Sequence, residues 1–219
     1  PGRMTVVPMG VDGALFRRAA VTPSSDARLD GRRVIIYLGR VAQSRQSDFL
    51  LDVVEALRER VPAILLVIAG DAPSGAEMEW MRKMIAGRGL QNHVLLTGWL
   101  PRPAALGYAV RAEVGLSPIP RGTLFDVSSP TKLVEYMALG IPGVATDIPD
   151  QQHVLADSGA GLCVPMEAGA FRDAVLEVLG NPETARNFAV RGPGYVQAHR
   201  TYTVLGARVA AAYERILPG

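Results

Sequence analysis

The sequence has little cysteine and little histidine, which excludes several kinds of site. Its single cysteine, Cys163, cannot form a disulfide within the chain, and its apolar surroundings predict a buried strand residue rather than a nucleophile. The three histidines are dispersed and show no metal-ligand spacing, at His93, His153 and His199. We therefore expect no disulfide framework and no metal cofactor. A cytoplasmic location fits this cysteine usage.

Long apolar runs, basic clusters and common phosphate-binding motifs are also missing. No run of about 18 apolar residues predicts a membrane span, and the first residues lack the pattern of a signal peptide. The net charge is +2 with scattered basic residues, so nucleic acid is not expected as a main partner. Neither Gly-x-Gly-x-x-Gly nor the P-loop pattern occurs, which argues against a dinucleotide dehydrogenase or a nucleoside triphosphatase.

The sequence does contain apolar runs that alternate with amphipathic segments over most of its 219 residues. The runs predict strands at 34–38, 64–69, 94–97, 114–117, 143–146 and 161–164. Helices are expected between the strands at 48–60, 77–87, 102–111 and 130–140, and after the last strand at 170–179. Because the run at 64–69 has no polar alternation, its strand should be buried on both faces, as in a parallel sheet. The pattern predicts an α/β fold, a Rossmann-like doubly wound parallel sheet of about six strands with helices on both faces.

The ends of the chain predict a linker and terminal helices. The expected division is a linker with a short strand at 4–7 over residues 1–32, the sheet domain over 33–180, and C-terminal helices over 181–219. These last helices should run to Leu217, with breaks at Asn181 and Pro182 and at Gly192 and Pro193. The isolated first strand suggests either that an upstream part is absent or that the N-terminus is natively short.

Ligands of doubly wound sheets bind beyond the carboxyl ends of the strands, so the residues after each strand are candidates. Arg40 and Arg45 follow the strand predicted at 34–38, and their guanidinium groups suit phosphate oxygens. Two solvated surface arginines are the alternative. Trp99 follows the strand predicted at 94–97, where it could flank a nucleobase or serve in packing.

The loop and helix at 125–146 suit an anion. Ser128 and Ser129 supply hydroxyls, Pro130 can start the helix, and Thr131 lies in the first turn. Free N–H groups and the helix dipole at this end favour a phosphate or diphosphate. Glu135, one turn further on, is placed to accept hydrogen bonds from the vicinal hydroxyls of a ribose, or else is an exposed helix glutamate.

In their order and spacing these motifs resemble the C-terminal, donor-nucleotide-binding half of a family-4 (group 1) GT-B glycosyltransferase. The segments that carry the resemblance are Gly39 and Arg40 with Arg45, residues 68–71 (IAGD), 97–99 (TGW) and 129–142 (SPTKLVEYMALGIP). Residues 7–12 (VPMGVD) resemble the family's interdomain linker. The resemblance covers nearly the whole chain.

The resemblance implies a sugar transferase that retains the anomeric configuration. The chain would bind the donor, a UDP-, GDP- or ADP-sugar, and an N-terminal domain of the same full-length protein would bind the acceptor. Membrane contact would then belong to that other half. Alone, the chain should bind nucleotide and transfer nothing.

The resemblance also implies roles for residues. Arg40 and Arg45 would hold the diphosphate and stabilise it as the leaving group, with Arg45 where the family usually has lysine. Glu135 matches the second acid of the family's Glu-x7-Glu pattern and would bind the ribose. These three are the expected catalytic residues. Further donor contacts are expected from Gly39, Gly98, Trp99, Leu100, Asp126, Ser128, Ser129, Thr131 and Lys132.

The chain departs from the family pattern at the first acid, which would address the donor sugar. Val127 occupies that position, and the nearest acid, Asp126, is out of register by one residue. Two other functions therefore stay open. The chain could be a non-catalytic nucleotide-binding or assembly module, or a nucleotide-sugar epimerase that would need acid and base groups such as His153 and Asp126.

Overall fold

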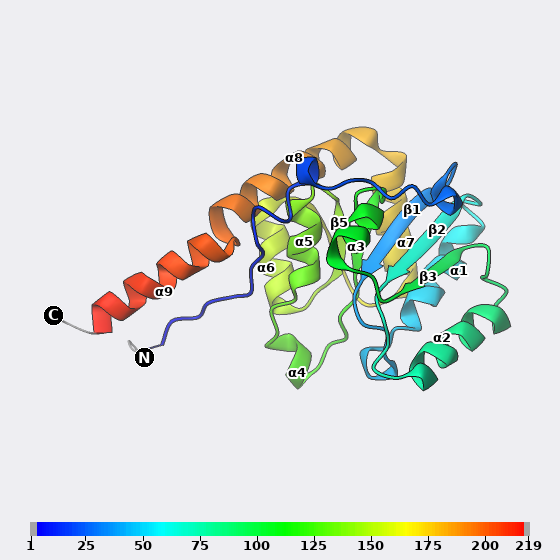
Figure 1. Cartoon of the computed structure of the whole chain (residues 1–219), viewed down its shortest axis with the longest axis horizontal. Helices are drawn as coiled ribbons and strands as arrows, with labels where there is room; N and C mark the ends of the chain where they lie inside the picture. The colour runs from blue at the N-terminus through cyan, green and yellow to red at the C-terminus, as the bar shows by residue number, and fades with distance from the viewer. Residues whose placement is uncertain (1–3, 217–219) are drawn as a thin grey trace.

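The computed structural model describes residues 4–216 and contains a six-stranded, wholly parallel sheet (Figure 1). Its strands are β1 (Arg33–Leu38), β2 (Ile64–Ala69), β3 (Val94–Gly98), β4 (Val114–Ser117), β5 (Gly143–Thr146) and β6 (Gly161–Val164). They lie in the order β3-β2-β1-β4-β5-β6. The chain thus winds outward in both directions from the switch point between β1 and β4, which confirms the predicted doubly wound sheet.

Helices cover both faces of the sheet. The α-helices of the described residues are α1 (Phe49–Arg58), α2 (Gly75–Gly87), α3 (Arg102–Ala109), α4 (Thr123–Asp126), α5 (Thr131–Ala138), α6 (Pro149–Ser158), α7 (Ala168–Gly180), α8 (Pro182–His199) and α9 (Tyr202–Ile216), of which α9 extends away from the sheet (Figure 1). Alternate residues of β1 belong to two separate cores. Val34 and Ile36 pack with α3, α5 and α6, whereas Ile35 and Tyr37 pack with α1, α2 and α7. Burial on both faces explains the continuous apolar strands.

The hydroxyl of Tyr136 on α5 lies at the switch point. The pairing of β1 with β4 involves only two residues of each strand, so Leu38 has no ladder partner on that side. Tyr136 is fully buried, and its hydroxyl accepts a hydrogen bond from the Leu38 N–H at 2.8 Å. It lies 3.2 Å from the Leu116 carbonyl oxygen, to which it can donate. Tyr136 therefore joins α5 to both strands where the sheet opens.

The strand expected at 4–7 is wrong. These residues form no strand, and Met4 and Val6 are 87% and 88% exposed. Their apolar, β-branched character favours a strand locally, but a strand needs a neighbour with which to pair. The first pairing along this segment is a single bridge between Val11 and Thr201. In Figure 1 the segment runs as an irregular strap beside the elongated α9.

The break expected at Gly192 and Pro193 is also wrong, because α8 continues through both residues. A proline inside a helix costs about 3 kcal/mol. Packing on α5 offsets this cost, since Gly192 lies so close to the α5 backbone that a Cβ there would come within 2.7 Å of the Met137 carbonyl oxygen. The break at Asn181 and Pro182 is confirmed, whereas the predicted helix end at Leu217 lies outside the described residues.

Two α-helices were not predicted from the sequence, α4 and α6.

Over residues 4–216, no helix is both long and apolar enough to cross a membrane.

Candidate functional site

A cleft of about 880 Å³ opens at the carboxyl ends of the strands. Its walls come from the end of β1, the loop after β3, the loop before α5 and α5 itself. Phe16 of the N-terminal segment adds an aromatic wall. This is the place where doubly wound sheets bind their ligands.

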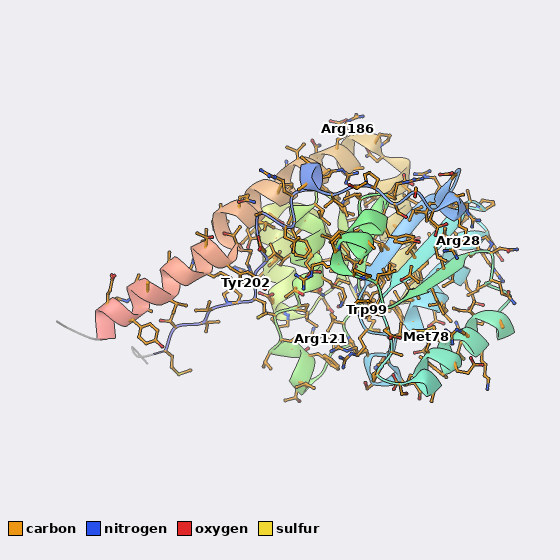
Figure 2. The ribbon with its side chains drawn as sticks, in the orientation of Figure 1. Arg28, Met78, Trp99, Arg121, Arg186 and Tyr202 are labelled. Atoms are coloured by element: carbon orange, nitrogen blue, oxygen red, sulfur yellow. The ribbon has the colours of Figure 1, made fainter. Side chains whose placement is uncertain are left out.

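The cleft brings together all but two of the site residues predicted from the sequence. Those that line it are Gly39, Arg40, Arg45, Trp99, Leu100, Ser128, Ser129, Thr131, Lys132 and Glu135. The two exceptions are Gly98 and Asp126. Gly98 adopts a left-handed turn with φ of +69°, and the next residue, Trp99, is 71% exposed (Figure 2).

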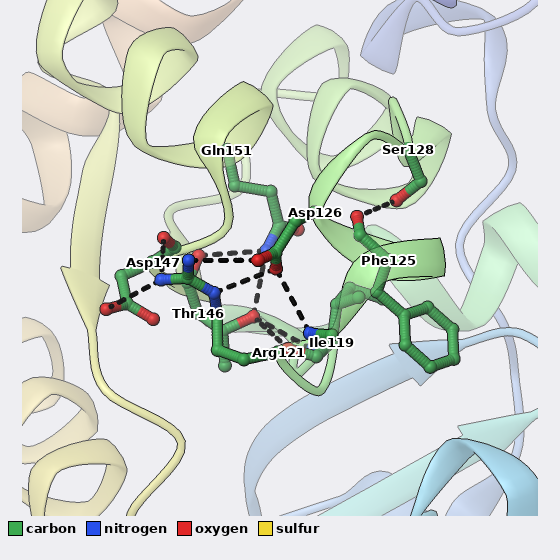
Figure 3. A network of polar contacts seen from close by, with 9 residues as sticks. Ile119, Arg121, Phe125, Asp126, Ser128, Thr146, Asp147 and Gln151 are labelled. Atoms are coloured by element: carbon green, nitrogen blue, oxygen red, sulfur yellow. Dashed lines mark hydrogen bonds and ion pairs between the residues drawn. The ribbon is translucent and has the colours of Figure 1, made fainter.

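Asp126 is engaged elsewhere. Its carboxylate accepts hydrogen bonds from Arg121 at 2.8 and 3.0 Å and from the Gly122 N–H at 3.2 Å. The Arg121 guanidinium holds the pKa of Asp126 below its usual value, and it also reaches Asp147 after β5 (Figure 3). The neighbouring Val127 is 83% exposed. The pair with Arg121 therefore ties the short α4 to β5, and a contact of Asp126 with a donor sugar stays a prediction.

Four cationic side chains line the cleft, those of Arg40, Arg45, Arg102 and Lys132. Arg40 and Arg45 are exposed at the end of β1. Lys132 on α5 is only 9% exposed, with its Nζ 4.9 Å from the centre of the Tyr37 ring. Burial, followed by the charge of Arg45, lowers the pKa of Lys132 to about 8. None of these four cations forms an ion pair with any residue between 4 and 216.

Glu135 lies on the same face of α5 as Lys132, because residues three apart are neighbours on a helix. It is partly buried, and burial raises the pKa of its carboxyl group. A hydrogen bond with Thr131 and the charges of Lys132 and Arg102 oppose this rise. The cleft therefore presents one half-buried carboxyl group close to its cations.

The hydroxyl groups of Ser128 and Ser129 are both hydrogen-bonded within the protein. Ser128 Oγ donates to the Phe125 carbonyl oxygen at 2.6 Å. Ser129 Oγ donates to Asp150 at 2.8 Å and accepts from the Met9 N–H at 2.9 Å. Both hydroxyls thus hold the loop in place. The donors that remain at this end are the first N–H groups of α5, which no side chain caps.

Sequence reasoning missed several residues that line the cleft, among them Arg102, Phe16 and Phe125. Arg102 lies 5.9 Å from the centre of the Phe16 ring, and Phe125 lines the cleft from α4. Arg102 comes shortly after β3, so the rule about strand ends that identified Trp99 could have found it. Phe16 gave no signal, since it belongs to an irregular segment far away in the sequence.

The residues considered for other chemistry lie apart from the cleft. His153 pairs with Asp157 at 3.2 Å on α6, and Cys163 is half-buried on β6, where burial raises its thiol pKa. Within the part of the chain that the structure describes, no three histidine, cysteine or acidic side chains gather as metal ligands. The expectation of no metal cofactor stays a prediction.

The six-stranded parallel sheet with helices on both faces is the fold of one half of a GT-B glycosyltransferase. The sequence profile of the family described as "Glycosyl transferases group 1" matches residues 32–181. The chain therefore belongs to this family of transferases. This confirms the resemblance inferred from the motifs.

Two curated relatives show the same kinship. Alpha-D-kanosaminyltransferase of Streptomyces kanamyceticus is 26% identical over 189 residues, which cover 86% of this chain and 47% of that enzyme. A GDP-mannose-dependent alpha-(1-6)-phosphatidylinositol monomannoside mannosyltransferase of Mycolicibacterium smegmatis is 28% identical over 215 residues, covering 93% and 54%. The chain thus spans about half the length of these relatives.

A solved structure shows the same fold. Alr3699/HepE of Anabaena, crystallised with UDP, superposes with a TM-score of 0.73 over 94% of this chain and 56% of its own, at 16% identity. Nearly all of this chain therefore matches about half of the Anabaena protein.

Proposed function

We propose that this chain is the donor-binding domain of a retaining glycosyltransferase and that its cleft takes a nucleotide-diphospho-sugar. One observation carries the proposal. Arg40, Arg45 and Lys132 meet the uncapped start of α5 in one cleft, without an ion-pair partner among the described residues. Positive charge gathered in this way is unfavourable until an anion neutralises it.

A diphosphate suits this arrangement chemically. Its oxygens can accept hydrogen bonds from guanidinium groups and from the N–H groups of a helix start. When the bond between the sugar and the diphosphate breaks, negative charge grows on the leaving phosphate oxygen. Arg40 and Arg45 would stabilise this charge, and their position at the cleft supports this role.

The remaining cleft residues fit the nucleoside. Glu135 offers a carboxylate that can accept hydrogen bonds from vicinal ribose hydroxyls. Trp99 and Leu100 provide an apolar edge for the base, and Phe16 with Arg102 forms a further wall.

The relatives support the choice of donor class. One is named as GDP-mannose-dependent, and the Anabaena structure contains UDP. We include UDP-, GDP- and ADP-sugars as donors. Four further parts of the proposal rest on the family likeness and the sequence pattern: an acceptor domain elsewhere in the full-length protein, retention of configuration, a cytoplasmic location, and chemistry without a metal.

Calorimetric titration with UDP, GDP and ADP tests the donor site. We expect one of them to bind, and Arg45→Ala to weaken that binding about 10- to 100-fold, the typical effect of losing a charge-assisted hydrogen bond. Arg186→Ala is the matched control, because Arg186 is exposed on α8 and does not line the cleft (Figure 2). Failure of all three nucleotides to bind would refute the donor site. Equal affinities of the two variants would remove Arg45 from it.

A non-catalytic nucleotide-binding module is the second candidate. The observation in its favour is that Glu135 is the only carboxylate that lines the cleft in the described residues. A transfer assay after joining the chain to its acceptor half separates the two functions. The epimerase has less support, because Asp126 is ion-paired with Arg121, His153 contacts Asp157, and neither Asp126 nor His153 lines the cleft.

A further inference from the structure

The chain contains 21 arginines and only two lysines, Lys83 and Lys132. Lys83 is exposed on α2. Lys132 is 9% exposed and lines the cleft. One of the two lysines of an arginine-rich chain thus lies in the cleft that Arg40, Arg45 and Arg102 also line.

The surroundings of Lys132 disfavour its charge. Its Nζ lies over the Tyr37 ring of β1, and a Cβ on Gly39 would come within 3.4 Å of its Cε. Arg45, just after β1, repels the ammonium, and Glu135 on the same helix attracts it. Burial raises the pKa of the Tyr37 phenol above its ordinary value. The phenol is therefore neutral in the pH range in which Lys132 titrates.

Lysine differs from arginine in one respect that matters here. An ammonium can release its proton when it is buried beside another cation, whereas a guanidinium stays charged. Burial and Arg45 lower the pKa of Lys132 to about 8. Near and above pH 8, Lys132 can therefore relieve the repulsion in the free chain by losing its proton, which Arg40 and Arg45 cannot do.

We propose that Lys132 takes up a proton when a diphosphate enters the cleft and becomes the third cation that holds it. The inference rests on the proposed function, and it adds a protonation step to donor binding. The proton comes from solvent and remains on Nζ, where it donates to a phosphate oxygen.

The sign of the pH dependence follows from linkage. The bound anion favours the ammonium, so the pKa of Lys132 is higher in the complex than in the free chain. Affinity is then highest below pH 8 and falls as the pH rises from the free-chain pKa toward that of the complex. Between these two values, binding takes up protons.

Selective labelling with ¹³C-lysine tests the first step, because the two lysines give two sets of side-chain signals. We expect Lys83 to titrate near the ordinary lysine value of about 10.4 and Lys132 near 8. Saturation with UDP, GDP or ADP, or with pyrophosphate, should move the Lys132 midpoint upward and leave Lys83 unchanged. A Lys132 that titrates with Lys83 in the free chain would overturn the inference.

Calorimetry at pH 8.5, in buffers of different ionisation enthalpy, tests the second step. A terminal phosphate with a second pKa near 6 is already ionised at this pH, so it contributes no uptake. We expect proton uptake with the wild type and with Lys83→Met. Lys132→Met should bind about 10- to 100-fold more weakly and Lys132→Arg should bind, both without uptake.

The outcomes separate the two proposals. Binding at pH 7 without proton uptake at pH 8.5, or uptake that persists in Lys132→Arg, would overturn the role of Lys132 and leave the donor site intact. No binding of any nucleotide at pH 7 would overturn the donor site, and the role of Lys132 with it.

Discussion

Replacement of Tyr136 by phenylalanine removes one buried hydroxyl at the switch point of the sheet. This hydroxyl accepts from the Leu38 N–H at 2.8 Å and lies 3.2 Å from the Leu116 carbonyl oxygen. Burial raises the pKa of Tyr136 well above its ordinary value, so the hydroxyl stays protonated and able to donate. Because Tyr136 is 0% exposed, water cannot easily replace the lost partner. An unsatisfied buried group costs about 1–3 kcal/mol, and this is the loss of stability we expect.

Urea unfolding followed by circular dichroism measures this loss. The midpoint should fall while the m-value stays the same, because the surface exposed on unfolding does not change. For a chain of this size the melting temperature should fall by about 2–4 °C for each kcal/mol. Tyr213→Phe removes the same group from α9, where the side chain is 61% exposed, and should change stability by less than about 0.5 kcal/mol. If the two variants are equally stable, the hydroxyl does not join α5 to the strands.

Two further changes test the backbone beneath the cleft and the N-terminal segment. Gly70→Ala should destabilise the chain by about 1–3 kcal/mol, because a Cβ at Gly70 (φ +158°) would come within 2.8 Å of the Gly39 carbonyl carbon. Gly75→Ala, with nothing near its Cβ, is the control, and equal melting temperatures would contradict the clash. Hydrogen bonds from Arg28 and Tyr108 lower the pKa of Asp26 in the folded chain, so its contribution is present above about pH 4 and lost as the pH falls below it. Melting temperatures of Asp26→Asn and the wild type should therefore differ at pH 6 and converge toward pH 2, and a constant difference would contradict this linkage.

The strands were predictable because each one is an apolar run that can be recognised from its own residues. An apolar run such as 64–69 can be recognised without knowledge of its partners, and Figure 1 shows it as β2, between β3 and β1. Helix α6 was not predictable in this way. Its buried residues are only Gln151, Val154 and Leu155. The side-chain amide of Gln151 donates hydrogen bonds to the carbonyl oxygens of Ser117 and Thr146. No clear apolar stripe marks such a helix.

The site was predictable where it depends on chain position and not where it depends on distant partners. Residues after strands could be found by rule, as Arg40 and Trp99 were. The orientation of the Ser129 hydroxyl could not, since it is set by Asp150 and by Met9, which lies 120 residues away in the sequence. The same holds for Phe16. Local patterns carry no information about which distant segment will pack against a loop.

Helix α5 connects the core to the cleft and explains how the site tolerates its own charge. Lys132 and Glu135 face the cleft, whereas Leu133 and Tyr136 are buried in the core that α5 shares with the sheet. Ser129 holds the loop before the helix, and Gly140 ends it in the left-handed conformation. Because the helix is fixed by this packing, the backbone of Lys132 is held close to the end of β1, where Arg45 follows. The only relief that the free chain offers for the repulsion is then loss of the Lys132 proton, and the same packing that stabilises the sheet preorganises the site for an anion.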